Sequence, residues 1–210
     1  MQLHKRDVVD AATTLLDGYG IADLTMRRLA RELNVSPGAL YWHFGNKQEL
    51  LGAVADRILE SVDDVPGEWR RRVAEICGRL RDALLSHTDG AELVSASFAA
   101  GQSEAMARIL ALLADAAVEA GVQREQAELA ARTVVYYVLG FTADEQSRMQ
   151  WDAAGATLPD GQSVWSDDAN SRFAFGLELV IAGISACPPQ PRFSDAQRPS
   201  SAREWMPNLR

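Results

Sequence analysis

Apolar residues recur every three to four positions along nearly the whole chain, which is the spacing of one face of an α-helix. No stretch shows a convincing alternation of apolar and polar residues, the mark of a half-buried strand. The pattern predicts two short helices between residues 25 and 43. It predicts longer helices over 5–17, 47–62, 68–87, 91–100, 103–120, 124–149 and 167–186. We therefore expect an all-α fold.

Residues 24–50 contain two short helices around a tight turn, followed by the start of a third. Thr25 suits the N-cap of the first helix, and Asn34 tolerates the left-handed conformation that ends it. Ser36 and Pro37 suit the cap and first position of the second helix, which is too short to be stable without neighbours. A helix, a tight turn and a short exposed helix form a helix-turn-helix, which places a helix in the major groove of DNA.

The chain divides into three segments. Residues 1–46 are expected to form a three-helix head that contains the helix-turn-helix, and residues 47–186 a larger helical body. Residues 187–210 contain five prolines and are expected to form an irregular tail.

The last predicted helix, 167–186, has apolar groups on most of its circumference. Gly176, Ala182 and Gly183 on this helix would allow another helix to approach closely. A helix buried between two subunits has this composition, so we expect a two-fold homodimer built on a four-helix bundle.

The charge of the chain is unevenly distributed. The 210 residues carry a formal net charge of −8, which does not by itself suggest a nucleic-acid partner. Residues 1–50 contain six basic and six acidic side chains, so the acidic excess lies entirely in the rest of the chain. A neutral head on an acidic body fits a protein that touches DNA with one end and has weak non-specific affinity.

Metal, redox and catalytic chemistries find little support in the sequence. The two cysteines, Cys77 and Cys187, indicate neither a zinc site nor a disulfide framework, as expected for a reducing cytoplasm. The three histidines lie in separate segments, and no GxSxG, GxGxxG or P-loop motif occurs. No apolar run is long enough to span a membrane. We predict a cytoplasmic protein that has no cofactor or metal site and is not an enzyme.

Four motifs follow one another in the head: Ala-Ala-Thr-Thr-Leu-Leu-Asp-Gly-Tyr-Gly-Ile at 11–21, Leu-Thr-Met-Arg-Arg-Leu-Ala at 24–30, Val-Ser-Pro-Gly-Ala-Leu-Tyr-Trp-His-Phe at 35–44 and Asn-Lys-Gln-Glu-Leu-Leu at 46–51. Through these motifs the chain resembles the TetR family of bacterial transcriptional regulators. The body resembles the tetracycline-repressor branch through His-Thr-Asp-Gly-Ala at 87–91, Leu-Gly-Phe-Thr-Ala-Asp-Glu-Gln at 139–146 and Phe-Gly-Leu-Glu-Leu-Val-Ile-Ala-Gly at 175–183. The resemblance implies a homodimer whose small DNA-binding heads sit on a larger ligand-binding and dimerisation domain.

For the head, the resemblance implies contacts with a double-stranded DNA operator. Small residues that open the second short helix would approach base edges, and aromatic residues at its end would contact phosphates and nearby bases. Residues that open the neighbouring helices suit phosphate oxygens. The predicted DNA-binding residues are Thr25, Arg27, Gly38, Ala39, Tyr41, Trp42, His43 and Lys47.

Not every aromatic residue in this segment is expected to touch DNA. Leu40 and Phe44 are expected to be core. Partial burial is the alternative for Trp42, and surface packing is the alternative for His43.

For the body, the resemblance implies a small-molecule effector site among the middle helices. Its predicted residues are Ile76, Leu80, Val94, Phe98, Met106, Tyr136, Tyr137, Phe141 and Asp144. Ordinary core packing is the alternative for each, since apolar stripes at helical spacing are mostly packing.

Tetracycline repressors hold a drug–magnesium chelate with histidines and a polar amide. The matching positions here are Asp63 and Val94 for the histidines and Ile76 for the amide, and only an acid, Asp144, is retained. A small apolar or aromatic effector is therefore expected in place of tetracycline–magnesium.

These features predict a ligand-responsive transcriptional regulator, a repressor on family precedent, that its effector releases from a palindromic operator. A small-molecule sensor or carrier that acts through protein contacts is the first alternative, and operator protection in a footprint would exclude it. A helical enzyme is the second, and turnover of a bound ligand would support it.

Overall fold

The computed structural model describes residues 3–155 and 169–186, and every regular element within these ranges is a helix. This confirms the expected all-α fold. The predicted irregular tail, 187–210, and most of the predicted loop before the last helix lie outside the described residues.

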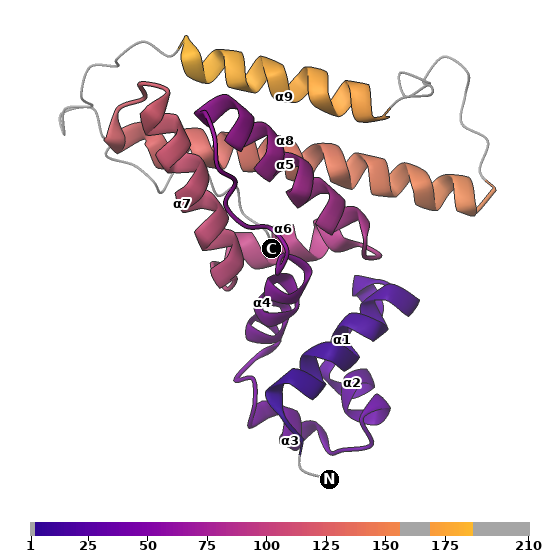
Figure 1. Cartoon of the computed structure of the whole chain (residues 1–210). Helices are drawn as coiled ribbons and strands as arrows, with labels where there is room; N and C mark the ends of the chain where they lie inside the picture. The colour runs from indigo at the N-terminus through magenta and orange to yellow at the C-terminus, as the bar shows by residue number, and fades with distance from the viewer. Residues whose placement is uncertain (1–2, 156–168, 187–210) are drawn as a thin grey trace, which may run out of the picture.

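The head holds three α-helices and a short 3-10 turn: α1 (Lys5–Tyr19), η1 (Ile21–Asp23), α2 (Met26–Glu32) and α3 (Pro37–Tyr41). A fourth helix, α4 (Lys47–Ile58), connects the head to the body. The body consists of α5 (Trp69–Leu85), α6 (Gly90–Ala100), α7 (Glu104–Glu119), α8 (Arg124–Ala153) and α9 (Ala169–Ser185). Figure 1 shows α2 and α3 at one end of the molecule and α9 at the other.

Side-chain caps fix the short helices of the head where the sequence predicts them. The Thr25 hydroxyl accepts the main-chain N–H of Arg28, and the Ser36 hydroxyl accepts that of Ala39. Asn34, with a φ of 52°, makes the turn between α2 and α3. These caps satisfy helix N–H groups that have no partner within their own helix, so two helices of seven and five residues are held in place.

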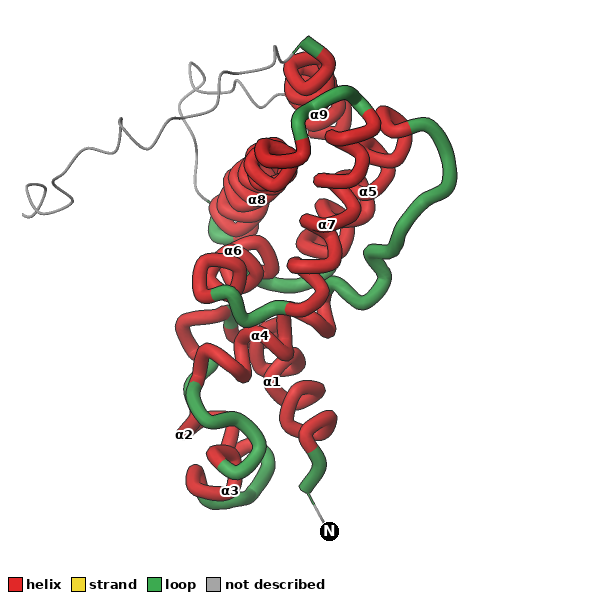
Figure 2. The backbone as a smooth tube through the Cα atoms, turned by 90° about the vertical axis from the view of Figure 1, so that its left-hand side faces the viewer, coloured by secondary structure: helices red, strands yellow, loops and turns green. Residues whose placement is uncertain are grey.

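One apolar core extends from the head into the body. In the head, Leu16, Leu29, Leu40 and Phe44 are at most 1% exposed, which confirms the last two as core residues. In the body the same core continues through α5, α6, α7 and α8. The tube in Figure 2 shows α4 between the two parts, with α1 beside it.

Close main-chain contact attaches α4 to the turn between α6 and α7. A Cβ atom at Gly52 would lie 2.2 Å from the main-chain oxygen of Gln102, so only glycine permits this approach. The Asp56 carboxylate accepts hydrogen bonds from the Ser103 hydroxyl at 2.7 Å and from the Ala105 N–H at 2.9 Å. The helix that carries the head is thus fixed to the body at the N-terminus of α7.

Helix α9 is attached to α5 and α8 by a partly buried polar and aromatic cluster. The Arg81 guanidinium makes two hydrogen bonds to Glu145, at 2.6 and 2.8 Å, and one to Asn170 at 2.8 Å. Its carbon lies 5.0 Å from the ring centroid of Phe173. The Tyr137 hydroxyl donates to the Phe173 carbonyl at 2.7 Å, and burial raises the pKa of Tyr137, which keeps this donor protonated.

Two helix ends differ from the expected bounds. Gly18 lies inside α1, and Gly20 alone ends that helix, with a φ of 78°. Helix α8 continues four residues beyond 149, to Ala153. The expected close approach of another helix at Gly176 is present within the chain: a Cβ atom there would lie 2.3 Å from the Tyr137 hydroxyl oxygen of α8.

Candidate DNA-binding surface and ligand cavity

The predicted DNA-binding residues lie on or beside α2, α3 and the start of α4, at the end of the molecule opposite α9 (Figures 1 and 2). Tyr41 is 51% exposed and Trp42 is 91% exposed. Thr25, Arg27 and Gly38 are also exposed, and the others are half-buried: Ala39, His43 and Lys47. The exposure of Trp42 rules out partial burial in the core, the alternative considered for it.

The basic residues of the head differ in how freely they can reach a ligand. Arg28 is committed within the head, because its guanidinium is 2.5 Å from the Asp23 carboxylate and lies 3.8 Å from the ring centroid of Tyr19. Lys5 lies over the ring of Phe44 at 4.9 Å. Arg27, by contrast, is exposed at the start of α2. Lys47 is the first residue of α4, where helix N–H groups and its ammonium group together favour an anion.

The N-terminus of α4 is well ordered by a reciprocal cap. The Asn46 side chain accepts the main-chain N–H of Glu49 at 2.9 Å, and the Glu49 carboxylate accepts the N–H of Gly45 at 2.9 Å. This cap fixes the start of α4, of which Lys47 is the first residue.

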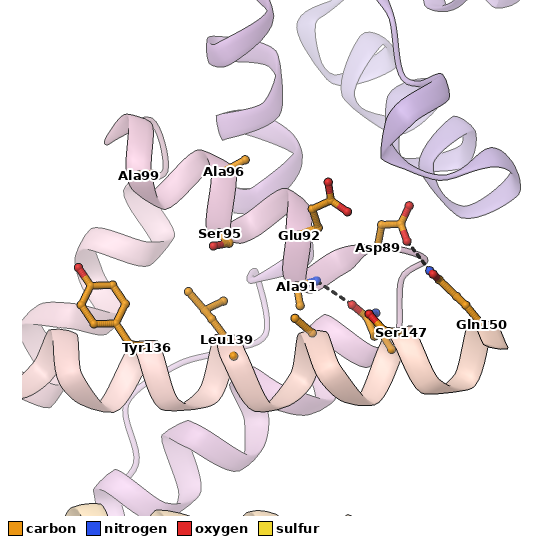
Figure 3. A pocket seen from close by; sticks show the side chains of 13 residues that line it. Asp89, Ala91, Glu92, Ser95, Ala96, Ala99, Tyr136, Leu139, Ser147 and Gln150 are labelled. Carbon is orange, nitrogen blue, oxygen red and sulfur yellow. Dashed lines mark hydrogen bonds between the residues drawn. The ribbon is translucent and has the colours of Figure 1, made fainter. Parts of the chain in front are cut away.

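In the body, a cavity of about 650 Å³ lies between α6 and α8. Small residues on both helices line this space: Ala96 and Ala99 on α6, and Gly140 and Ala143 on α8. Figure 3 shows α6 and α8 on either side of it, with Tyr136 and Leu139 at one end and Asp89 and Gln150 at the other. One part of the wall is apolar and contains Leu139 and Tyr136. The other part is polar, with Asp89, Glu92, Ser95, Gln146, Ser147 and Gln150, and none of the described residues that line the cavity is basic.

A second cavity, of about 500 Å³, lies where the body meets the end of α1. Asp17 of the head lines it together with residues 85–89 and the C-terminal part of α8. Asp89, Gln146 and Gln150 line both cavities, so these side chains stand between them.

Of the nine predicted effector residues, Tyr136 lines the larger cavity. Ile76, Leu80, Val94 and Met106 are at most 1% exposed and belong to the core. Phe98 lies next to Tyr136, with ring centroids 5.9 Å apart, and Asp144 is exposed. Tyr137 and Phe141 pack around Phe173 and so attach α9. Effector contact for the nine residues stays a prediction.

Sequence reasoning did not identify the polar wall of the cavity. Gln146 and Gln150 are one helical turn apart on α8, and the small residues Gly140, Ala143 and Ser147 follow the same face. Small and polar residues at this spacing on an otherwise apolar helix were the available signal. Within the described parts of the chain, no three His, Cys, Asp or Glu side chains are grouped to hold a metal ion, and no helix is long and apolar enough to cross a membrane.

Comparison with known proteins covers both parts of the chain. Residues 8–54 match the family model of bacterial regulatory proteins, tetR family, and residues 63–163 match that of the tetracyclin repressor-like C-terminal domain. The chain is 34% identical over 193 residues to tetracycline repressor protein class E of Escherichia coli, which covers 86% of this chain and 90% of the relative.

Two solved structures extend the comparison. BioQ of Mycobacterium smegmatis has a TM-score of 0.82 and 60% identity, and the match covers 88% of this chain and 99% of that one. A BioQ structure with its natural double-stranded DNA operator has a TM-score of 0.77 and 57% identity, over 89% of this chain and 100% of that one.

Proposed function

Because this chain belongs to the TetR family of bacterial regulatory proteins, it is a DNA-binding transcriptional regulator, and we propose that it represses from a palindromic operator as a homodimer. The observation that carries the proposal is the exposed surface formed by α3 and the start of α4, with Tyr41 and Trp42 outward. The similarity to a BioQ bound to its operator, at 57% identity over nearly the whole chain, supports the same role. We propose no catalytic activity.

For four of the eight predicted residues we propose a specific type of DNA contact. Gly38 and Ala39 face the base edges, because their small size allows the main chain of α3 to come close. Tyr41 and Lys47 contact phosphates and set the position of the head on the duplex. Two symmetric heads would reach successive major grooves, about 34–36 Å apart.

Dimerisation is proposed through α8 and α9. Phe173, Leu177 and Ile181 face the core of their own subunit, whereas Phe175 and Leu179 on the other side of α9 are 69% and 60% exposed. An apolar stripe of this kind on a long helix is costly in water and fits a second copy of the same helix in a two-fold bundle.

The effector is proposed to bind in the cavity between α6 and α8. Its apolar wall fits a small apolar or aromatic body, while the amides of Gln146 and Gln150 offer hydrogen-bonding groups at the other end. A volume of about 650 Å³ is in the range of cavities that enclose small ligands. An effector that prefers a conformation with differently placed heads lowers operator affinity by its differential affinity for the two states.

DNA binding is tested with purified protein and the fragments that it selects from its source genome. Tyr41→Ala and Lys47→Ala should each weaken operator binding at least tenfold, the effect of losing about 1.4 kcal/mol. Lys47→Ala should also make the slope of log K against log salt concentration less steep by about one per subunit, the contribution of one phosphate contact. Asp115→Asn is a matched surface control, because Asp115 is exposed on α7, far along the chain from the head.

The outcome that contradicts this part of the proposal is sequence-preferring binding that survives both alanine substitutions unchanged. Absence of any sequence preference at moderate salt would instead favour a sensor or carrier that acts through protein contacts.

The cavity is tested with Nile red, a neutral aromatic dye. Ala143→Leu would fill space between α6 and α8 and should reduce the dye's emission enhancement several-fold. Ala111→Leu is the control, since Ala111 is exposed on α7 and does not line this cavity. Equal dye binding by both variants would place the apolar site elsewhere.

A further inference from the structure

Three of the four residues between α5 and α6, His87, Thr88 and Asp89, contact the end of α1 and the turn after it. His87 Nδ1 is 3.0 Å from an Asp17 carboxylate oxygen. The Thr88 hydroxyl donates to the Asp17 carbonyl at 3.0 Å, and the Thr88 N–H donates to the Asp17 carboxylate at 3.3 Å. The carbonyls in the last turn of a helix have no partner within it, so the Thr88 hydroxyl completes the end of α1.

Asp89 adds a second contact, to the turn that follows α1. One of its carboxylate oxygens accepts the main-chain N–H of Ile21 at 2.9 Å. A Cβ atom at Gly20 would lie 2.6 Å from the same oxygen, so a larger residue there would displace the carboxylate. Asp89 itself has a φ of 54°, a left-handed conformation that aspartate tolerates better than most residues. The residue types at positions 20 and 89 therefore both suit this contact.

The same carboxylate is joined to α8. The other oxygen of Asp89 accepts the side-chain amide of Gln150 at 2.5 Å, the bond drawn at the right of Figure 3. One turn earlier, the Gln146 amide donates to the carbonyls of Leu84 and His87 at 3.0 and 2.8 Å and accepts the N–H of Ala91 at 3.0 Å. Two glutamines of α8 thus support the segment that contacts the head.

These glutamines and Asp89 also line the cavity between α6 and α8. Gln146 hydrogen-bonds the main-chain groups of Leu84, His87 and Ala91, and both Leu84 and Ala91 are buried. Gln150 is exposed at the rim, and its amide bonds directly to the carboxylate that holds Ile21. A ligand group that takes the Gln150 amide therefore removes one of the two donors that fix this carboxylate.

We propose that Asp89 is a positioning residue that holds the DNA-binding head in one orientation, and that Gln150 connects it to the cavity. A ligand in the cavity takes the Gln150 amide away from the Asp89 carboxylate. The carboxylate can then rotate more freely, and its hydrogen bond to the Ile21 N–H weakens. The head then pivots about the end of α1 as a folded unit, because its own core residues, such as Leu29 and Leu40, take no part in this contact. The inference rests on the proposed function, since it describes how the cavity reaches the head.

The first test is hydrogen exchange of the Ile21 amide in the full-length protein. Asp89→Gly retains the left-handed conformation but removes the acceptor, and should speed exchange at Ile21 about tenfold or more. Gln150→Ala leaves Asp89 in place and should speed the same amide by a smaller factor. Asp89→Asn, which retains one acceptor oxygen, should restore most of the protection.

Restoration by asparagine separates this role from a merely structural one, because a loop that is loosened for other reasons would remain loose. Amides in the core of the head, such as those of Leu29 and Leu40, should exchange as in the unmodified protein. Asp82→Asn is the matched control, as Asp82 is an exposed carboxylate near the end of α5.

The second test measures the orientation of the head with spin labels on the exposed residues Glu32 and Asp115, each replaced by cysteine. Cys187 is replaced by serine, and labelled chains are diluted with unlabelled ones. Asp89→Gly and Gln150→Ala should both broaden or shift the distance distribution between the labels, whereas Asp82→Asn should not.

Unchanged exchange at Ile21 in Asp89→Gly, or an unchanged distance distribution in Gln150→Ala, would overturn the proposal. Neither measurement uses DNA. Failure of operator binding in the unmodified protein would therefore count against the proposed function, while these results would count only against the role of Asp89 and Gln150.

Discussion

Replacing Arg81 with alanine should destabilise the protein by about 3–5 kcal/mol, the usual cost of breaking a buried ion pair by removing one partner. The side chains of Arg81 and Glu145 are only 9% and 14% exposed. Arg81→Ala leaves the Glu145 carboxylate without its two hydrogen bonds and leaves the Asn170 side-chain oxygen without its donor. The same substitution removes the cation that lies 5.0 Å from the Phe173 ring.

Most of this cost comes from leaving the Glu145 carboxylate without a partner, so replacing both Arg81 and Glu145 should cost less. Arg81→Leu with Glu145→Leu removes both charges and fills similar volume, and such replacements are often neutral or stabilising. The double variant should therefore recover most of the loss, to within about 1–2 kcal/mol of the unmodified protein.

Urea unfolding at one fixed protein concentration measures these free energies, since dimer formation makes apparent stability depend on concentration. Arg81 also positions α9, so the single variant should lower the fraction of dimer in analytical ultracentrifugation. A loss below about 1 kcal/mol in Arg81→Ala would refute the reasoning, as would a double variant that is less stable than the single one.

Three further predictions concern packing. Gly52→Ala should cost about 1–3 kcal/mol in urea unfolding, because its Cβ would collide with the Gln102 main chain, whereas Gly78→Ala, with nothing within 4 Å, should stabilise α5 by about 0.5–1 kcal/mol. Equal changes in the free energy of unfolding for the two alanine variants would contradict this prediction. Burial raises the pKa of the Cys77 thiol and keeps reagents from it. In a variant whose other cysteine is replaced by serine, Ellman's reagent should therefore react with Cys77 only after the protein unfolds. Reaction in the native state at pH 8 would contradict this prediction. Tyr137→Phe should cost about 0.5–1.5 kcal/mol by loss of its bond to α9, and an unchanged urea midpoint would count against that bond.

The sequence was a sufficient guide to the head because its signals are local. The caps at Thr25, Ser36 and Asn46 and the left-handed turn at Asn34 each depend on residues within three positions. Helical spacing likewise placed the helices of the body, with errors at their ends. The end of α1 was placed two residues too early, because Gly18 is tolerated inside the helix at a cost of only about 1 kcal/mol relative to alanine, and Gly20 adopts the positive φ that ends it.

The cavity could not be predicted in the same way. Its walls come from two helices that are far apart in sequence, and its volume depends on the small side chains of one facing those of the other. A stripe such as Ile76 and Leu80 has the same spacing whether it lines a cavity or fills a core, and here both residues are core. The contacts of Asp89 with Ile21 and Gln150 span 68 and 61 positions, and only the fold brings them together.

The most direct measurement of the central claim is selection of genomic fragments by the purified protein at moderate salt, followed by a footprint of the recovered site. The proposed homodimer predicts a palindrome whose half-sites are centred about 10–10.5 base pairs apart or at a multiple of that spacing. It also predicts that protection is lost in Tyr41→Ala and Lys47→Ala but not in Asp115→Asn. Recovery of no fragment above background, or protection that both head variants retain, would contradict it.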